Sequence, residues 1–318
     1  MGGALTAIRN LLPFGSAGRS LPTAQIKESD TMKTLTHFAL AMLLVAQAGA
    51  ADNSAAEKLG WQLAVHAYTF KEFPIHEAID KTAQLGLQYM SLSGSVNLDG
   101  KKPVPTPTIS DEDLGAIKRK LADAGIKKVV NWGVVKLPPD EAKCREIFEM
   151  AKKMGTEVLV SEPEPEALDV IEKLCKEYRM RVAIHNHPRK PKDPNYKVWD
   201  PDYVMSLVKD RDPAIGACAD TGHWLRSGLD PVECLKKLEG RIIALHFKDL
   251  NEKGNPKAHD VPWGTGVGNA KGQMEELKRQ GFRGAFCIEY EHNWKESVPE
   301  IAQCVKFFNA TCDELAGR

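Results

Sequence analysis

The chain has 318 residues, with 43 Lys and Arg against 43 Asp and Glu, a formal net charge of zero and 42% hydrophobic residues. These are values of an ordinary globular protein, and they exclude a largely disordered chain, a collagen-like repeat and a multi-span membrane protein. A balanced charge also argues against a general nucleic-acid binder. Seven cysteines spread over this length do not form the framework of a small disulfide-rich protein.

The first 50 residues resemble a leader that ends in a secretory signal peptide. Residues 33–50 (KTLTHFALAMLLVAQAGA) combine a lysine, an apolar run and spaced small residues, and Met32 just before them is a candidate start. The run is too short for a permanent membrane anchor. We therefore predict a leader and signal peptide in 1–50, a secreted or periplasmic protein, and one working domain at 51–318. An amphipathic transit segment is the alternative, because two arginines stand among serines there.

Removing this leader changes the charge of the chain. Residues 1–50 hold four basic and two acidic residues, so the remainder has 39 basic and 41 acidic residues, a net charge of −2. The seven cysteines all remain, and Cys218 and Cys287 stand in apolar runs where a buried thiol is expected.

From residue 61 onward, short apolar runs alternate with longer segments of helical periodicity. The runs predict strands at 61–68, 87–92, 127–132, 156–161, 181–185, 215–220, 242–247 and 285–290. The periodic segments predict helices at about 75–85, 111–124, 139–154, 164–178, 201–210, 231–239, 270–280 and 297–313. Eight strand–helix units over about 260 residues predict an α/β fold of the (β/α)8 TIM barrel type.

Capping residues support these helix boundaries. Ser110 with Asp113 resembles a capping box, and Asp200 and Asp230 each precede a proline at the first helical position. Five glycines follow predicted helix ends, where a left-handed residue is favoured: Gly86, Gly125, Gly155, Gly240 and Gly281. A doubly wound open sheet is the alternative fold, although no glycine-rich GxGxxG follows the first strand.

Histidines and carboxylates gather where the predicted strands end, which is where barrel enzymes place their chemistry. Strands five to eight each offer one inward-facing ligand, and together the four predict a divalent metal site: His185, Asp220, His246 and Glu289. Mixed imidazole and carboxylate ligands suit Mn, Zn, Co or Fe better than Mg. For any single residue, a hydrogen-bonded polar group at a strand end is the alternative. For Glu162, at the end of strand four, three roles stay open: a metal ligand, a base, or an acidic residue at the start of the next helix.

Further residues at this end are candidates for catalysis or substrate binding. Lys248 follows His246 on the same face and could donate to a substrate oxygen, with a solvated lysine as the alternative. His187 could act as a base. The predicted substrate-binding residues are His66, Tyr68, His223, Trp224, Asp249 and Glu291. Capping of the next loop is the alternative for Asp249. Trp224, Trp263 and Trp294 could stack on a sugar ring, with core packing as the alternative.

Four short motifs in this order resemble the sugar phosphate isomerase/epimerase family with the xylose isomerase-like TIM barrel. They are IHNH at 184–187, DTGH at 220–223, HFKD at 246–249 and IEYE at 288–291, and the resemblance covers about 61–313. It implies a metal held by Glu, Asp, His and Glu, which fall here at His185, Asp220, His246 and Glu289. The first position departs from the family, because ketose epimerases use both glutamates to shuttle the substrate proton. Glu162 or His187 would then supply the second base.

The resemblance implies proton abstraction next to a carbonyl through a metal-stabilised enediolate, on a sugar or keto-sugar. We expect an isomerase or epimerase, with elimination from a secreted 3-keto-glycoside, a lyase reaction, as the alternative. A homo-oligomer is compatible with the sequence. An apurinic-site endonuclease on the same barrel would need a basic groove, against which the net charge speaks. A non-catalytic sugar- or metal-binding protein would lack a spare base beside the metal.

Overall fold

The computed structural model describes residues 54–317, so the predicted leader and signal peptide lie outside the described residues. Eight parallel strands close into a barrel in the order β1-β10-β9-β8-β7-β6-β5-β2, which confirms the predicted fold. Their bounds are β1 (Trp61–His66), β2 (Tyr89–Leu92), β5 (Lys128–Val135), β6 (Val158–Ser161), β7 (Arg181–His185), β8 (Ile215–Asp220), β9 (Ile242–Phe247) and β10 (Gly284–Ile288).

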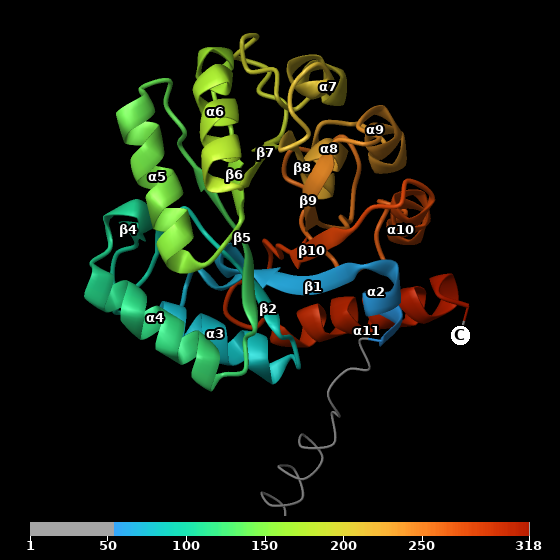
Figure 1. Cartoon of the computed structure of the whole chain (residues 1–318). Coiled ribbons are helices and arrows are strands. Elements are labelled where there is room, and N and C mark those ends of the chain that lie inside the picture. The colour runs from blue at the N-terminus through green and yellow to red at the C-terminus, as the bar shows by residue number, and fades with distance from the viewer. Residues whose placement is uncertain (1–53, 318) are drawn as a thin grey trace, which may run out of the picture. The chain divides into compact units, whose positions relative to one another are not determined.

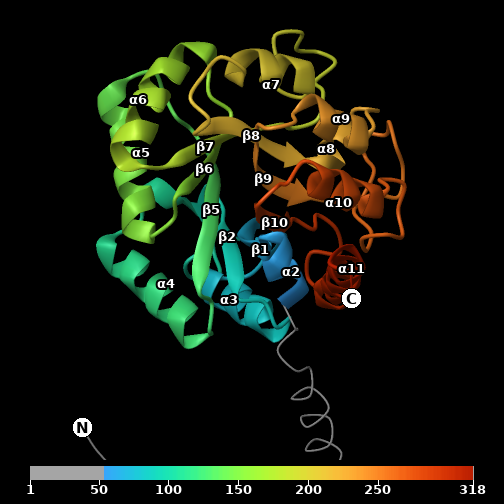
Figure 2. The same cartoon turned by 45° about the vertical axis from the view of Figure 1, so that its right-hand side comes forward.

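Helices surround this barrel on its outside, as Figures 1 and 2 show. The eight predicted helices are α3 (Ile75–Gln84), α4 (Asp111–Asp123), α5 (Glu141–Met154), α6 (Leu168–Tyr178), α7 (Pro201–Val208), α9 (Pro231–Lys237), α10 (Ala270–Arg279) and α11 (Val298–Leu315). A short helix, α2 (Ser54–Leu59), precedes the first strand and lies beside α11. Three 3-10 turns complete the set: η1 (Ala67–Phe70), η2 (Thr106–Thr108) and η3 (Pro165–Ala167).

The predicted caps begin and end these helices. The Ser110 side chain accepts a hydrogen bond from the backbone N–H of Asp113 at 3.0 Å. Asp140, which was not predicted as a cap, accepts one from Lys143 N–H at 2.9 Å. Asp200 and Asp230 also accept from N–H groups in their own first turns. Helix α5 ends at Met154 and is capped by Gly155, whose φ of 79° is strained for any residue with a Cβ. The local sequence therefore sets these helix boundaries.

Besides α2 and the 3-10 turns, a further helix and a hairpin were not predicted. Helix α8 (Thr221–Arg226) follows β8 directly, and a hairpin of β3 (Ser95–Val96) and β4 (Val104–Pro105) follows β2. Both are too short to leave a periodic pattern of apolar residues. They nevertheless matter, because α8 and the hairpin each form part of the rim where the strands end.

Small apolar side chains fill the barrel interior, and larger ones pack between barrel and helices. Ala64, Cys218, Ala244 and Cys287 are among the interior groups. All seven cysteines are buried. Outside, Trp61 packs on Phe286 with ring centroids 4.9 Å apart. The described part of the chain contains no helix that is both long and apolar enough to cross a membrane.

Candidate metal centre

Four buried side chains meet at the carboxyl ends of four neighbouring strands. His185 ends β7, Asp220 ends β8, His246 lies near the end of β9 and Glu289 directly follows β10. The four can each place one ligand atom so that these atoms lie within 4.8 Å of one another. Asp220 and His246 are direct register partners of β8 and β9. The parallel sheet thus brings the four predicted ligands together.

Glu162 orients the first of these side chains. It follows β6, and its carboxylate accepts a hydrogen bond from His185 Nδ1 at 3.0 Å. This bond turns His185 Nε2 toward the centre, as carboxylates behind metal-binding histidines do. Burial alone would lower the pKa of His185, but the nearby Asp220 and Glu162 carboxylates raise it to about 9. A metal at Nε2 would therefore displace a proton.

Asp220 divides its two oxygens between the backbone and the centre. One oxygen accepts the N–H of His223 at 2.7 Å and so caps α8, while the other points to the His185 and Lys248 side chains. Burial opposes ionisation, but the neighbouring His223, Lys248 and His185 side chains hold the pKa of Asp220 far below its usual range. Asp220 is thus an ionised acceptor in the middle of the site.

Lys248 brings a positive charge to the same carboxylates. Its ammonium lies 2.9 Å from Asp220, 2.8 Å from Glu289 and 3.0 Å from Glu291, and the side chain is completely buried. Gly222 makes room for it, because a Cβ there would stand 2.7 Å from the Lys248 side chain. Burial disfavours the charged form, but these acids raise the pKa of Lys248 well above its ordinary value. Lys248 therefore keeps its charge.

The unpaired ligand atoms fit a divalent metal ion. Among the described residues, His185 Nε2 and His246 Nε2 are buried without a hydrogen-bond partner, a costly state unless something binds there. Two imidazoles with two carboxylates form a donor set for Zn, Mn, Fe or Co. The ammonium of Lys248 shares the Asp220 and Glu289 oxygens with such an ion. The single positive charge of Lys248 offsets only part of the combined negative charge of Asp220, Glu289 and Glu291.

His66 borders the centre as a neutral group. Its Nδ1 accepts the backbone N–H of Tyr68 at 3.2 Å, so its Nε2 carries the proton and donates to Gly133 O at 3.1 Å. Burial lowers the pKa of His66 to about 3, against the opposing charge of Glu289. Both ring nitrogens are used, so His66 shapes the site without being free to bind a metal.

An open pocket of about 490 Å³ lies over these groups. Seven of the predicted site residues line it: His66, Tyr68, His185, His187, His223, Glu289 and Glu291. His187 stacks on His223 with ring centroids 5.2 Å apart, and its Nδ1 is bonded to Glu162. This bond leaves His187 Nε2 as the atom available to a ligand. The pocket therefore has imidazoles on its β7–β8 side and carboxylates on its β10 side.

A family model described as "Xylose isomerase-like TIM barrel" matches residues 79–309, well over half of the chain. The chain belongs to the xylose isomerase-like TIM barrel family. Membership confirms the resemblance of the four motifs, and the family barrel explains why ligands from four strands converge.

Several known proteins are similar to this chain in sequence or structure. An inosose dehydratase from Clostridium tetani is 34% identical over 86 residues, which cover 27% of each chain. Other inosose dehydratases match over about half of their length at lower identity. A crystal structure of an uncharacterized protein from Parabacteroides distasonis is 33% identical, with a TM-score of 0.61 over 78% of this chain and 98% of that one. The IOLI protein, described with a bound zinc atom, shares the fold at 17% identity and a TM-score of 0.58, over 80% and 98%.

The structure does not bring three of the aromatic or acidic candidates into the pocket of this xylose isomerase-like barrel. Trp224 and Trp263 are buried in the hydrophobic core, where Trp263 packs edge-on against Phe247. Asp249 instead accepts hydrogen bonds from the N–H groups of Gly264, Gly266 and Gly268. The substrate-binding predictions for Trp224 and Asp249 are therefore corrected: apolar contacts bury the first, and loop anchoring occupies the second.

Other residues of the family member's site were not foreseen from the sequence. Arg226 contacts Glu291 at 2.7 Å and Asp260 at 3.1 Å, and it donates to His223 Nδ1 at 3.0 Å. The Tyr196 hydroxyl donates to Glu162 at 3.1 Å. Both come from segments after the strands, so only their place in the rim loops could have pointed to them. Arg226 also stands one helical turn after His223, which is the signal that the sequence offers.

Proposed function

We propose that this protein is a metal-dependent lyase that eliminates a β-substituent from a keto-sugar or keto-cyclitol. The observation that carries the proposal is which residue types stand at the four ligand positions. The first is an imidazole, His185, and Glu289 is the single carboxylate ligand that faces the pocket. The similar inosose dehydratases are named for elimination of water from a keto-cyclitol, which supports the reaction class. The chain matches half or less of the length of these relatives, so the substrate itself is a proposal.

A bound divalent cation would polarise the substrate carbonyl and so acidify the neighbouring C–H bond. His185, Asp220, His246 and Glu289 would hold this ion. The chain's own groups would move the proton. Charge from Lys248 and His246 outweighs burial and lowers the pKa of Glu289 far below normal, so Glu289 is ionised and able to accept.

Elimination also needs an acid for the leaving group. His187 lies on the opposite side of the pocket from Glu289, since β7 and β10 are separated by β8 and β9. Glu289 would take the C–H proton and a carbon–carbon double bond would form. The leaving oxygen would depart with the bonding pair and receive the Nε2 proton of His187 in its doubly protonated form, while Glu162 holds the Nδ1–H. Lys248, which contacts three carboxylates, would keep a positive charge beside Glu289 while the proton moves.

Epimerisation or isomerisation is the second candidate. The observation in its favour is the same pair of groups on opposite sides of the pocket, because one could remove a proton and the other return it on the second face. The two reactions share the first step and differ in whether a bond to oxygen breaks.

The distinguishing experiment is incubation of the metal-loaded protein with keto-cyclitols, keto-sugars and 3-keto-glycosides in deuterated water. We expect release of water or of the aglycone, with an unsaturated product. Deuterium at one carbon without such release would instead establish epimerisation or isomerisation and contradict the lyase. Glu289→Gln should lower turnover by about a hundredfold or more, whereas the exposed control Glu296→Gln should not. Unchanged turnover by Glu289→Gln would contradict its role.

A further inference from the structure

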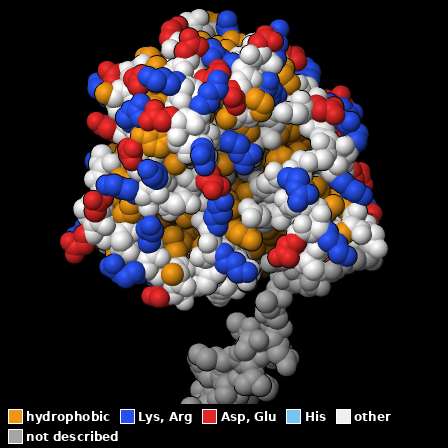
Figure 3. Space-filling model, in the orientation of Figure 1, with side chains coloured by type: hydrophobic (Ala, Val, Ile, Leu, Met, Phe, Trp, Pro, Cys, Tyr) orange, Lys and Arg blue, Asp and Glu red, His pale blue; other side chains and the backbone are white. Residues whose placement is uncertain are grey.

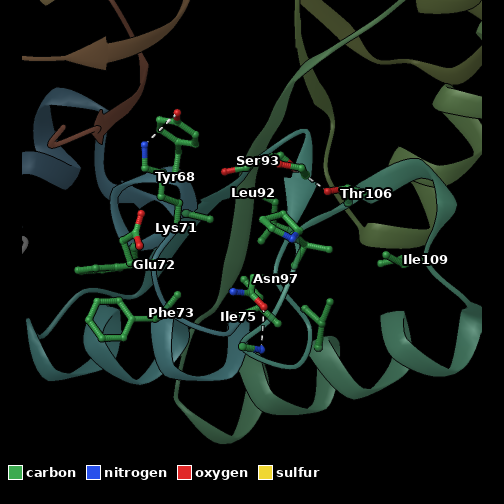
Figure 4. A pocket seen from close by; sticks show the side chains of 18 of the residues that line it. Tyr68, Lys71, Glu72, Phe73, Ile75, Leu92, Ser93, Asn97, Thr106 and Ile109 are labelled. Carbon is green, nitrogen blue, oxygen red and sulfur yellow. Dashed lines mark hydrogen bonds between the residues drawn. The ribbon is translucent and has the colours of Figure 1, made fainter. Parts of the chain in front are cut away.

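A second cavity adjoins the metal-site pocket. It has a volume of about 310 Å³ and lies among η1, α3, α4 and the β3–β4 hairpin, so we call it the hairpin cavity. Tyr68, Ser93 and Ser95 line both spaces. Figure 4 shows Tyr68 and Ser93 at one end of the hairpin cavity, with Phe73 and Ile75 at the other. The two spaces are therefore neighbours that meet at these shared residues.

The walls of the hairpin cavity favour an uncharged, apolar occupant. Phe70, Ile75, Ala78 and Leu114 form part of its buried lining. Two lysines also line it, and the exposed Lys101 ammonium lies 3.3 Å from the Asp99 carboxylate. The ammonium of Lys71 is already engaged. It donates to the Tyr68 hydroxyl at 3.3 Å and lies 3.6 Å from the centroid of the Trp294 ring. An engineered apolar cavity of about 150 Å³ holds a benzene molecule, so the hairpin cavity has room for a substituted aromatic ring.

Ser93 marks the junction between the two spaces. Its side-chain hydroxyl is buried and, among the described residues, has no hydrogen-bond partner. The backbone of Ser93 is fixed separately, since its carbonyl accepts bonds from the Thr106 hydroxyl and the Trp132 indole. A buried hydroxyl without a partner costs free energy. Because Ser93 lines both spaces, a ligand that spans them would lie next to this residue.

We propose that the hairpin cavity binds an aromatic substituent of the substrate while the keto-sugar ring occupies the metal-site pocket. The proposal rests on the lyase function and names its substrate class, an aryl keto-glycoside. In the elimination, the bond between the sugar carbon and the aryl oxygen breaks. The oxygen takes the bonding pair and one proton, and a phenol remains in the hairpin cavity.

The test is calorimetric titration of the metal-loaded protein with 4-nitrophenyl β-glucoside and with methyl β-glucoside, neither of which carries the ketone. Burial of the ring predicts that the aryl glucoside binds about tenfold or more tightly than the methyl glucoside. Ala78→Leu, which fills the hairpin cavity, should remove most of this preference and leave methyl glucoside binding unchanged. The same change on the exposed side of α4, Ala116→Leu, should behave as wild type.

Phe73→Ala provides a second variant at the partly exposed end of the cavity, should Ala78→Leu fail to fold. It should also weaken aryl binding selectively. Equal affinity of the wild type for both glucosides, or equal losses of both in the variants, would overturn the proposal. Because binding is measured without turnover, an aryl preference without elimination would contradict only the lyase. Elimination without an aryl preference would contradict only the hairpin cavity's role.

Discussion

Lys248 carries a buried positive charge at the centre of the site. It is fully buried against Asp220, Glu289 and Glu291, and its single positive charge offsets one of their three negative charges. Removal of one partner from a buried ion pair typically costs about 3–5 kcal/mol, because the other charge is left unpaired.

We therefore expect Lys248→Met to lower the free energy of unfolding of the metal-free protein by about 3–5 kcal/mol. A divalent metal should restore more stability in this variant than in the wild type, because it replaces the lost positive charge. Urea unfolding with chelator and with added metal measures both effects. The control Lys176→Met removes an exposed ion pair to Glu172 and should cost under about 1 kcal/mol. A metal-free Lys248→Met variant as stable as wild type would contradict the account.

His66 gives a pH dependence of known sign. Its pKa is about 3 in the folded protein and 6.5 in the unfolded chain, so between these values the unfolded chain binds a proton that the folded state excludes. The free energy of unfolding should therefore fall as pH falls below 6.5, by about 1.4 kcal/mol per pH unit from this group. The difference between wild type and His66→Gln, measured by unfolding at several pH values, isolates it. The exposed His76→Gln is the control, and an equal pH slope for wild type and His66→Gln would refute the assignment.

At the scale of elements, Asp249 holds the long 251–269 loop in place. Its carboxylate accepts the N–H groups of Gly264, Gly266 and Gly268 at 2.8–3.0 Å. Gly266 is required by this contact, since a Cβ there would stand 2.4 Å from the Asp249 oxygen. The same loop carries Asp260, which contacts Arg226 and so reaches the site.

Asp249→Ala should lower the free energy of unfolding by about 2–4 kcal/mol, because several hydrogen bonds to a buried charge are lost. Hydrogen exchange should accelerate in 250–269 more than elsewhere, while metal affinity should change little. Asp123→Ala, on an exposed position of α4, is the control. Strong loss of metal without faster exchange in this loop would show that Asp249 acts on the metal centre instead.

The strands, the helix caps and the four converging ligands could be predicted because each depends on local patterns joined by one rule of barrel geometry. Asp200 followed by Pro201, for example, is a local signal that predicts the start of α7. The roles of Glu162, Lys248 and Asp249 could not be fixed in the same way. Each is decided by partners 15 to 43 residues away in sequence, so the alternatives for these residues stayed open until the contacts were known.

At the scale of the whole molecule, positive and negative side chains are interspersed on the face shown in Figure 3. That face has no extended basic area of the kind that binds nucleic acid, in agreement with the net charge of −2 beyond residue 50. The charge of zero for the full chain combines this mildly acidic part with residues 1–50, which carry a net charge of +2.

We propose that residues 1–50 are removed during export, so that the mature protein begins near Ala51. Mass spectrometry of the intact protein from the periplasm or medium of an expressing bacterium should give a mass that starts there. The control is the same protein with Ala48 and Ala50 replaced by bulky residues, which should remain unprocessed. An exported protein that retains residues before Met32 would contradict the proposal.

The most direct test of the central claim is the metal content of the purified protein, measured by plasma mass spectrometry after dialysis against zinc or manganese. The account predicts about one equivalent in the wild type and in the exposed control His292→Ala. It predicts loss of the metal in His185→Ala and Asp220→Asn, each with circular dichroism like the wild type. A wild type that binds no divalent metal, or variants that keep it, would contradict the assignment of these residues as the metal centre.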